Sequence, residues 1–341
     1  MNKIDLDKYC SKYFNKTVEI LEKFNQNNQI VMQFFQREDN VVLSGIDYCV
    51  DLLKSNISDF SDIEIWALKE GAIINAGEPV LKICGPYHKF AKLENVIDGV
   101  LSRKSSVATN SKRVLDAANG KSVIYMNDRN DYYFDQAEDA HAAYIGGFRS
   151  FVTNDQVSKL PEKLVPIGTI PHALIQNFGG DLIKCLSAYK ATFPKENLIA
   201  LVDYHNNVIR EALSAAKNFP ELFAVRVDTS ISLIDAYFMG KEYEYNGKNI
   251  HGVNEHLIRA LRKELDNNGY KNVKIIASSG FDASKIDYFE KSNVPVDIYG
   301  VGQWLTNKVV NFTGDAVILN GKDEAKLGRQ NVINNNLVKV I

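Results

Sequence analysis

The sequence predicts an α/β protein that combines a barrel-like domain of parallel strands with a smaller N-terminal domain. From about Lys104 onward, strand-like apolar runs alternate with helix-like stretches, which is typical of a parallel sheet with crossover helices. The first hundred residues have a different texture, with short alternating strands between helices. The length of 341 residues suits one barrel of about 250 residues with a smaller domain beside it.

The N-terminal part is predicted to be an α+β segment with antiparallel strands. Tyr13–Phe24 and Ile46–Leu53 have the apolar spacing of helices, and Ile63–Leu68 and Val80–Ile83 are strand candidates between turns. At the other end of the chain, Ala316–Leu319 runs into Asn320-Gly321, the signature of a type I′ hairpin. We expect this hairpin to return to the N-terminal domain.

The barrel-like part has six strand candidates, each followed by a helix-like stretch. They are Val123–Met126, Val165–Ile167, Leu198–Val202, Phe223–Val227, Val273–Ala277 and Val296–Tyr299. Asn254 and Asp282 have the side chains and positions of helix N-caps. The segment Lys241–His251, which contains Asn246-Gly247, interrupts the alternation and is predicted to be a hairpin-like excursion.

Composition excludes several classes of protein. A formal charge of −2 argues against a nucleic-acid binder, because affinity for a phosphate backbone requires a basic surface. The N-terminus lacks the apolar core of a signal peptide, and no apolar run approaches the roughly 18 residues of a membrane span. The four cysteines are scattered, which argues against disulfides and structural zinc. We therefore expect a cytoplasmic protein that binds neither nucleic acid nor membrane.

Two glycine-bearing turns near the C-terminus are the most informative feature of the sequence. Ser278-Ser279-Gly280 follows one strand candidate, and Gly300-Val301-Gly302 follows the next. Glycine lets backbone N–H groups approach an anion, and the loops after the last two strands of α/β barrels often bind phosphate in this way. The pair predicts a phosphorylated substrate.

Charged side chains follow other predicted strands of the same domain. Arg226 and Asp228 close one strand and Asp203 another, so we expect them on the face where barrels carry their catalytic groups. The guanidinium of Arg226 suits a phosphate, and Asp228 suits a ribose hydroxyl or a hydrated Mg²⁺ ion. A structural ion pair between the two is the alternative. His172, in a Gly-Thr-Ile-Pro-His turn, is either a core histidine or a functional one.

Taken in order, these segments resemble the nicotinate phosphoribosyltransferases, type II phosphoribosyltransferases that also include quinolinate phosphoribosyltransferase. The resemblance covers nearly the whole chain. Its most specific motifs are Gly168–Leu174, Arg226–Thr229, Ser278–Phe281 and Val296–Gly302, and weaker ones are Tyr13–Leu21, Leu93–Asn95, Ser105–Asn110 and Ala142–Gly147.

The resemblance implies an N-terminal open-faced α/β sandwich packed on an irregular α/β (TIM-like) barrel. We predict that residues 1–103 form the sandwich, completed by residues 312–341, and that residues 104–311 form the barrel. It further implies a head-to-tail homodimer in which the site lies between one subunit's barrel and the partner's N-terminal domain.

The resemblance also implies roles for individual residues. Tyr13 matches an aromatic residue that stacks on the pyridine ring from the partner subunit, and Arg129 matches an arginine near the pyridine carboxylate and pyrophosphate. Arg226 and Asp228 match contacts to the ribose phosphate, and the two glycine turns match the 5′-phosphate site. His172 matches the histidine that ATP phosphorylates in the nicotinate enzymes. The remaining predicted substrate-binding residues are Arg103, Asn154, Thr169 and Thr229.

The implied reaction joins nicotinate to the ribose of phosphoribosyl pyrophosphate, releases pyrophosphate, and belongs to NAD biosynthesis. The pyridine nitrogen attacks C1 of the ribose as pyrophosphate leaves through an oxocarbenium-like state, so no general base is required. Mg²⁺ is the expected cofactor, with Asp228 as its predicted ligand, and ATP is the expected co-substrate. One departure is that the chain reads Asp203-Tyr204-His205-Asn206 where the family commonly has Asp-Thr-aromatic-Asp.

Three alternatives remain. Quinolinate phosphoribosyltransferase is one, because Arg103 lies where that enzyme also has an arginine. The second is a catalytically silent relative that binds phosphorylated metabolites. A barrel aldolase or isomerase with the same phosphate site is the third, but we find no convincingly placed Schiff-base lysine or acid–base pair.

Overall fold

The computed structural model describes residues 4–341, which form two compact units. The first unit contains the chain up to residue 112, residues 141–147 and residues 306–341. The second contains residues 113–140 and 148–305. The first unit thus combines early residues of the chain with its last segment, and its limits at residues 112 and 306 differ from the predicted 103 and 312. The domain boundaries themselves stay a prediction.

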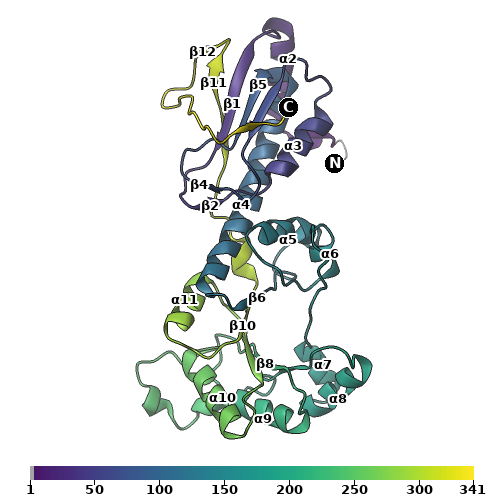
Figure 1. Cartoon of the computed structure of the whole chain (residues 1–341), viewed down its shortest axis with the longest axis vertical. Helices are drawn as coiled ribbons and strands as arrows, with labels where there is room; N and C mark the ends of the chain where they lie inside the picture. The colour runs from purple at the N-terminus through teal and green to yellow at the C-terminus, as the bar shows by residue number, and fades with distance from the viewer. Residues whose placement is uncertain (1–3) are drawn as a thin grey trace. The chain divides into compact units, whose positions relative to one another are not determined.

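The first unit is built on a six-stranded antiparallel sheet (Figure 1). Its strand order is β12-β11-β1-β5-β3-β13. The bounds are β1 (Gln29–Phe35), β3 (Glu64–Ala67), β5 (Leu81–Pro86), β11 (Thr313–Leu319), β12 (Lys322–Asp323) and β13 (Val338–Lys339), with the separate pair β2 (Val41–Val42) and β4 (Ile73–Ile74). The antiparallel pairing of β3 with β5 confirms the prediction for those two segments. Strand β1 was not among the predicted strands.

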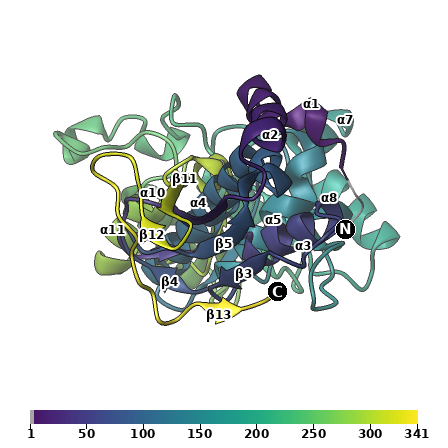
Figure 2. The same cartoon turned by 90° about the horizontal axis from the view of Figure 1, so that it is seen from above.

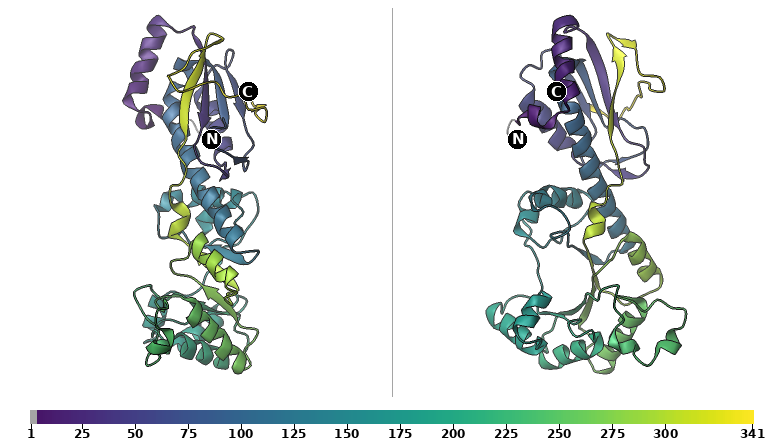
Figure 3. Two further views of the ribbon diagram at one scale, coloured as in Figure 1. Left: turned by 90° about the vertical axis from the view of Figure 1, so that its left-hand side faces the viewer. Right: turned by 180° about the vertical axis from the view of Figure 1, so that it is seen from behind.

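Helices cover one face of this sheet, and the apolar core lies between them and the strands (Figure 3). The helices are α1 (Leu6–Tyr9), α2 (Lys12–Phe24), α3 (Ile46–Asn56) and the start of α4 (Glu94–Ala117), with short 3-10 turns η1 (Tyr87–Lys89) and η2 (Ala91–Leu93). Phe34 and Ile83 from the sheet and Leu53 and Leu101 from the helices are all fully buried in this core. Helices α2 and α3 confirm both helices predicted for this region.

The C-terminal segment completes the unit. Asn320 and Gly321 have left-handed backbones, with φ of 49° and 78°, and connect β11 to β12, so the predicted hairpin is confirmed. Strand β11 pairs along the whole of β1, which confirms the expected return to the N-terminal part. The chain then crosses the sheet, where Lys82 donates to Asn331 at 2.7 Å, and ends with β13 beside β3 (Figure 2).

The second unit is built on five parallel strands in the order β6-β10-β9-β8-β7. Their bounds are β6 (Ser122–Tyr125), β7 (Ile199–Leu201), β8 (Ala224–Val227), β9 (Lys274–Ala277) and β10 (Ile298–Val301). The helices are α6 (Asn154–Val157), α7 (His172–Asn177), α8 (Leu182–Thr192), α9 (Val208–Asn218), α10 (Glu255–Asn267) and α11 (Ala283–Lys291), and α5 (Gln136–Ile145) begins in this unit and ends in the first. Short 3-10 turns are η3 (Tyr133–Asp135), η4 (Ala236–Phe238), η5 (Glu242–Tyr245) and η6 (Gln303–Thr306). The predicted α/β class, with a parallel sheet and an antiparallel N-terminal part, is confirmed.

The strand predicted at Val165–Ile167 is wrong. This stretch forms no strand, and its backbone contact is a single bond from the Ile167 N–H to the carbonyl of Phe151 at 2.8 Å. Pro166 has no N–H to give to a ladder, and the side chain of Val165 is 80% exposed, so neither pairing nor burial stabilises a strand here. The parallel ladder is therefore open between β7 and β6, apart from the isolated Tyr125–Phe151 bridge.

The hairpin predicted over Lys241–His251 is also wrong. The segment forms the 3-10 turn η5, and only an isolated bridge joins His251 to Ile234. The helix caps are confirmed, since Asn254 accepts from the N–H of Leu257 at 3.0 Å and Asp282 from that of Lys285 at 2.7 Å. None of the helices in residues 4–341 has the length and apolar character that crossing a membrane requires.

Two carboxyl groups on α4 are partly buried in the first unit. Burial raises the pKa of Glu94 to about 7, although a hydrogen bond with the Tyr87 hydroxyl opposes this shift. Burial likewise raises the pKa of Asp98 to about 6, against a backbone hydrogen bond from Gly314. Asp315 on β11 adds a like charge that raises both pKa values further.

We predict that this pair makes the protein less stable as the pH rises from about 5 to 8. In this range the folded state retains protons that the unfolded state, with its lower carboxyl pKa values, has lost, so raising the pH favours unfolding. Urea unfolding at a series of pH values measures the effect. Glu94→Gln should flatten the dependence, whereas Glu19→Gln on the exposed surface of α2 should leave it as it is. An unchanged slope in Glu94→Gln would contradict the assignment.

Candidate active site

The two glycine-bearing turns lie at the same edge of the parallel sheet. Strand β10 pairs with β9 in parallel, with Ile298 opposite Ile276 and Tyr299 opposite Ala277. The turn at Ser278–Gly280 leaves the carboxyl end of β9, and Gly302 follows the carboxyl end of β10. The prediction is therefore confirmed for Ser278–Gly280, whereas of the predicted turn at Gly300-Val301-Gly302 only Gly302 follows its strand, because Gly300 and Val301 still belong to β10.

The first turn has a backbone that suits a close approach by an anion. Ser279 and Gly280 are both left-handed, with φ of 72° and 67°, and no neighbouring atom lies within 4 Å of the position where a Gly280 side chain would begin. Helix α11 begins three residues later, behind its Asp282 cap. The partial positive charge of its N-terminus adds to the attraction that free N–H groups exert on a phosphate.

The second turn has glycines because the chain is crowded there. A Cβ on Gly302 would lie 2.7 Å from the carbonyl oxygen of Met126 and 2.7 Å from the amide nitrogen of Asn130. A Cβ on Gly300 would lie 2.7 Å from the sulfur of Met126. The absence of side chains lets the ends of β10 and β6 meet. Val301, between the two glycines, is buried in β10.

The register places the candidate residues on one face of the sheet. In parallel strands, residues opposite one another point to the same side. Arg226 lies opposite Ile276 on one neighbour and Leu201 on the other. Side chains alternate between the two faces of a strand with a period of two residues. Asp228, Ser278 and Asp203 each lie two residues beyond Arg226, Ile276 and Leu201, so they belong to the same face, past the ends of their strands.

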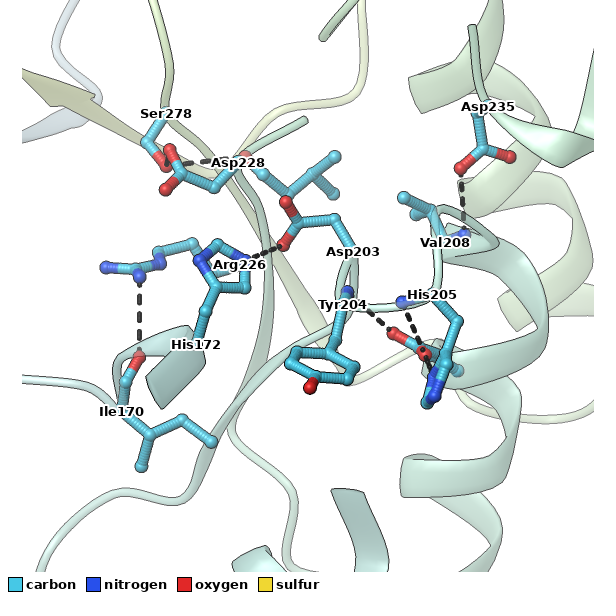
Figure 4. Close-up of polar contacts among 12 residues, drawn as sticks. Ile170, His172, Asp203, Tyr204, His205, Val208, Arg226, Asp228, Asp235 and Ser278 are labelled. Carbon is cyan, nitrogen blue, oxygen red and sulfur yellow. Dashed lines mark hydrogen bonds and ion pairs between the residues drawn. The ribbon is translucent and has the colours of Figure 1, made fainter. Parts of the chain in front are cut away.

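Five of the predicted residues come together at this edge (Figure 4). His172, at the start of α7, lies with its Nε2 3.1 Å from Oδ1 of Asp203. The Ser278 hydroxyl donates to Oδ1 of Asp228 at 2.8 Å. Arg226 donates from Nη2 to the carbonyl of Ile170 at 3.4 Å, a long bond that engages one corner of the guanidinium. These contacts join the loop before α7 to the ends of β7, β8 and β9.

Burial shifts the pKa values of Asp203 and Arg226 in this cluster. It raises the pKa of Asp203, while the neighbouring His172 lowers that pKa and the like charge of Asp228 raises it again. Burial lowers the pKa of Arg226, and Asp228 and Asp203 raise it. The Nε of Arg226 is buried and has no hydrogen-bond partner among residues 4–341. Because buried donors are normally satisfied, this nitrogen is available for an anionic ligand.

The other residues predicted for this unit lie in different environments. Arg129 is exposed in the loop after β6, yet its charge and that of Asp128 affect the pKa of Arg226, so both are close to it. Thr169 is half-buried before α7, and Asn154 is exposed as the first residue of α6. Thr229 is buried, and its hydroxyl has no hydrogen-bond partner among the described residues.

Tyr13 and Arg103 belong to the first unit. Tyr13 is 60% exposed on α2, with its ring against Phe14 at a centroid distance of 4.2 Å. Arg103, on α4, donates to the carbonyl of Thr306 at 3.1 Å. Their predicted contacts with substrate stay predictions.

Sequence reasoning missed two neighbours of the site. Asp128 directly precedes Arg129 after a predicted strand, so its position was a usable signal. The ring of Tyr204 lies 6.4 Å from that of His172, centroid to centroid, and no sequence pattern indicated this. No group of three or more His, Cys, Asp or Glu side chains within residues 4–341 is arranged to hold a metal ion by itself.

An antiparallel sheet unit together with a parallel sheet whose strand ends gather an arginine, two aspartates and glycine-bearing turns defines an α/β protein whose sheet edge suits a phosphorylated ligand. The family model for the quinolinate phosphoribosyl transferase N-terminal domain matches residues 12–105. Nicotinate phosphoribosyltransferase pncB2 of Mycobacterium tuberculosis is 25% identical over 248 residues, which cover 71% of this chain and 48% of that one. Nicotinate phosphoribosyltransferase of Bacillus subtilis is 25% identical over 295 residues, covering 84% and 53%. The chain spans about half the length of these curated relatives.

Comparison with solved structures indicates the same relationship as the sequence comparisons. The nicotinate-nucleotide pyrophosphorylase of Pyrococcus furiosus superposes with a TM-score of 0.80 at 31% identity, covering 95% of this chain and 78% of that one. Human nicotinic acid phosphoribosyltransferase has the same fold, with a TM-score of 0.69 at 17% identity, covering 97% and 77%. The chain belongs to the family of the nicotinate phosphoribosyltransferases and the related quinolinate phosphoribosyltransferases.

We predict that Gly302→Ala disrupts the predicted phosphate site. The new methyl group would require the backbone at Met126 to move, which typically costs about 1–3 kcal/mol of stability. Urea unfolding with and without ribose 5-phosphate measures both effects, and the variant should lose the stabilisation that this ligand gives. Gly99→Ala on α4, where a methyl group meets no atom within 4 Å, is the control and should retain it. If ribose 5-phosphate stabilised the two variants equally, the result would contradict the assignment of Gly302 to the phosphate site.

Proposed function

We propose that the protein is a nicotinate phosphoribosyltransferase that forms nicotinate mononucleotide and pyrophosphate in NAD biosynthesis. The observation that carries this proposal is the gathering of Arg226, Asp228 and Asp203 beside the turns at Gly280 and Gly302. Relatives that match most of this chain carry the name nicotinate phosphoribosyltransferase, which supports the choice of substrate.

The site suits a sugar that carries phosphate at both ends. In this proposal the turns at Ser279–Gly280 and Gly302 bind the 5′-phosphate, and Asp228 accepts a ribose hydroxyl. Arg226, with Arg129 close to it, stabilises the leaving pyrophosphate. Charge stabilisation of a leaving group by a pre-positioned guanidinium lowers the barrier without any proton transfer by the protein.

Mg²⁺ fits this set of residues as a substrate-bound ion. Asp203 and Asp228 are close enough for one carboxylate to raise the pKa of the other, and they end neighbouring strands. Mg²⁺ is usually bound through one or two carboxylates together with substrate phosphates and waters. Asp228 and Asp203 would hold the hydrated ion, which supplies positive charge to the pyrophosphate.

We further propose that ATP phosphorylates His172 and that two chains form the active enzyme. The imidazole is 44% exposed and its Nε2 contacts Asp203, so a carboxylate can orient it. The homodimer is supported by the exposed ring of Tyr13, which a partner subunit's substrate would cover.

Quinolinate phosphoribosyltransferase is the second candidate. The family model that matches residues 12–105 takes its description from that enzyme, and Arg103 supplies an additional cation in the first unit. A catalytically silent relative would retain the phosphate turns and lose turnover.

Incubation with phosphoribosyl pyrophosphate, Mg²⁺ and one pyridine at a time tests the proposal. We predict release of pyrophosphate with nicotinate, a higher yield when ATP is present, and no release with nicotinamide or quinolinate. Turnover of quinolinate alone, with release of CO₂, would assign the second function instead. Binding of phosphoribosyl pyrophosphate without turnover of any pyridine would indicate the silent relative.

We predict that His172→Ala abolishes ATP hydrolysis and leaves some transferase activity, because the imidazole accepts phosphate from ATP but does not contribute to the departure of pyrophosphate. Release of phosphate from ATP and formation of nicotinate mononucleotide are measured on the same sample. An ATPase rate equal to that of the unaltered protein would remove His172 from the coupling step.

A further inference from the structure

The loop after β7 is a tight turn that directs Asp203 toward His172. The N–H of Asn206 donates to the carbonyl of Asp203 at 3.1 Å, which closes a four-residue turn. Asn206 has a left-handed backbone, with φ of 53°, which asparagine tolerates better than most residues. The Asp203 side chain is 7% exposed and reaches Nε2 of His172.

Glu211, in the first turn of α9, binds this loop from behind. Its carboxylate accepts from the N–H of Tyr204 at 3.2 Å, from the N–H of His205 at 3.2 Å and from Nδ1 of His205 at 2.5 Å. The residue is only 6% exposed, and within residues 4–341 its carboxylate pairs with the imidazole of His205. A buried carboxylate is costly unless several donors satisfy it, and here three donors come from one turn.

Close packing against Gly180 restricts the opposite side of the turn. Gly180, between α7 and α8, has no side chain, and a Cβ there would lie 3.1 Å from Nε2 of His205 and 3.3 Å from the ring of Tyr204. On a third side, Asn206 donates to the carbonyl of Ile234 at 2.8 Å. The peptide groups on both sides of Tyr204 are thus fixed from several directions.

We propose that Glu211 is a positioning residue that fixes the turn after β7 so that Asp203 meets Nε2 of His172. Glu211 acts through the backbone that carries Asp203 and does not itself touch the reacting groups. The consequence for catalysis rests on the function proposed above. The structural part concerns only Glu211, Asp203 and His172 and can be measured without turnover.

The experiment compares Glu211→Gln with Glu211→Asp in the full chain. Glutamine has the same shape, but its NH₂ group would face one of the N–H donors that the carboxylate accepts. Glu290→Gln on α11 is the matched control, since Glu290 is also a largely buried carboxylate, paired with Lys121 and the Tyr299 hydroxyl and away from the turn. ¹⁵N correlation spectra of the imidazoles report which nitrogen of His172 carries the proton, and the His172→Gln variant assigns the signal.

We expect the unaltered protein and Glu290→Gln to show His172 protonated at Nε2, as donation to an ionised Asp203 requires. Glu211→Gln should lose this preference, and Glu211→Asp should recover part of it. Misplacement of this kind costs up to about 10²-fold in rate. We therefore expect a fall of that order in the ATP-coupled kcat of Glu211→Gln.

The outcomes separate the two proposals. An unchanged His172 signal in Glu211→Gln, or an equal change in Glu290→Gln, would overturn the positioning role. If the signal depends on Glu211 but no pyridine is turned over by the unaltered protein, the positioning role stands and the proposed function fails.

Discussion

The register of the parallel sheet in the second unit is the constraint on which the candidate site depends. Successive side chains of a strand point to opposite faces of the sheet. A slip of one residue would therefore turn Arg226, Asp228 and Ser278 toward the helices. It would also bring Val225 and Val227 to the face that now carries Arg226. The buried apolar residues on the helix side oppose such a slip, because they would then face the polar edge. The same hydrophobic pattern that stabilises the sheet therefore selects which residues can meet a ligand.

Close packing at the edge is the second requirement, and glycine provides it. The end of β10 passes so near to Met126 that side chains at Gly300 and Gly302 would collide with it, while Ser279 and Gly280 bend the chain after β9 through a left-handed region. Ser279 is half-buried and Gly280 is exposed, so the first turn places its backbone at the surface of this edge. The sheet register and the two turns together concentrate donors where the strands end.

Much of this arrangement follows from the sequence, because its causes are local. Apolar runs followed by glycine or a charged residue predicted β6 to β10 within a few residues, and the caps at Asn254 and Asp282 were evident from residue type and spacing. Val165–Ile167 misled because apolar composition outweighed Pro166, whose missing N–H prevents pairing. The contact of His172 with Asp203 joins residues 31 positions apart and depends on loop geometry, which no local pattern encodes. Glu211 was overlooked for the same reason, since a glutamate in the first turn of a helix is usually solvated.

The balance of charge at the edge explains why a metal ion belongs in the proposed reaction. Asp128, Asp203 and Asp228 influence the same region as Arg129 and Arg226, so carboxylates outnumber guanidinium groups there. Such a set does not by itself attract a substrate that carries several phosphate charges, even with donors from Ser279 and Gly280 nearby. A divalent cation between the carboxylates and the pyrophosphate would reverse the local sign, and it would also relieve the repulsion that raises the pKa of Asp203. In the proposed reaction the carboxylates would hold the ion at this edge, and the arginines would complete the neutralisation of the leaving group.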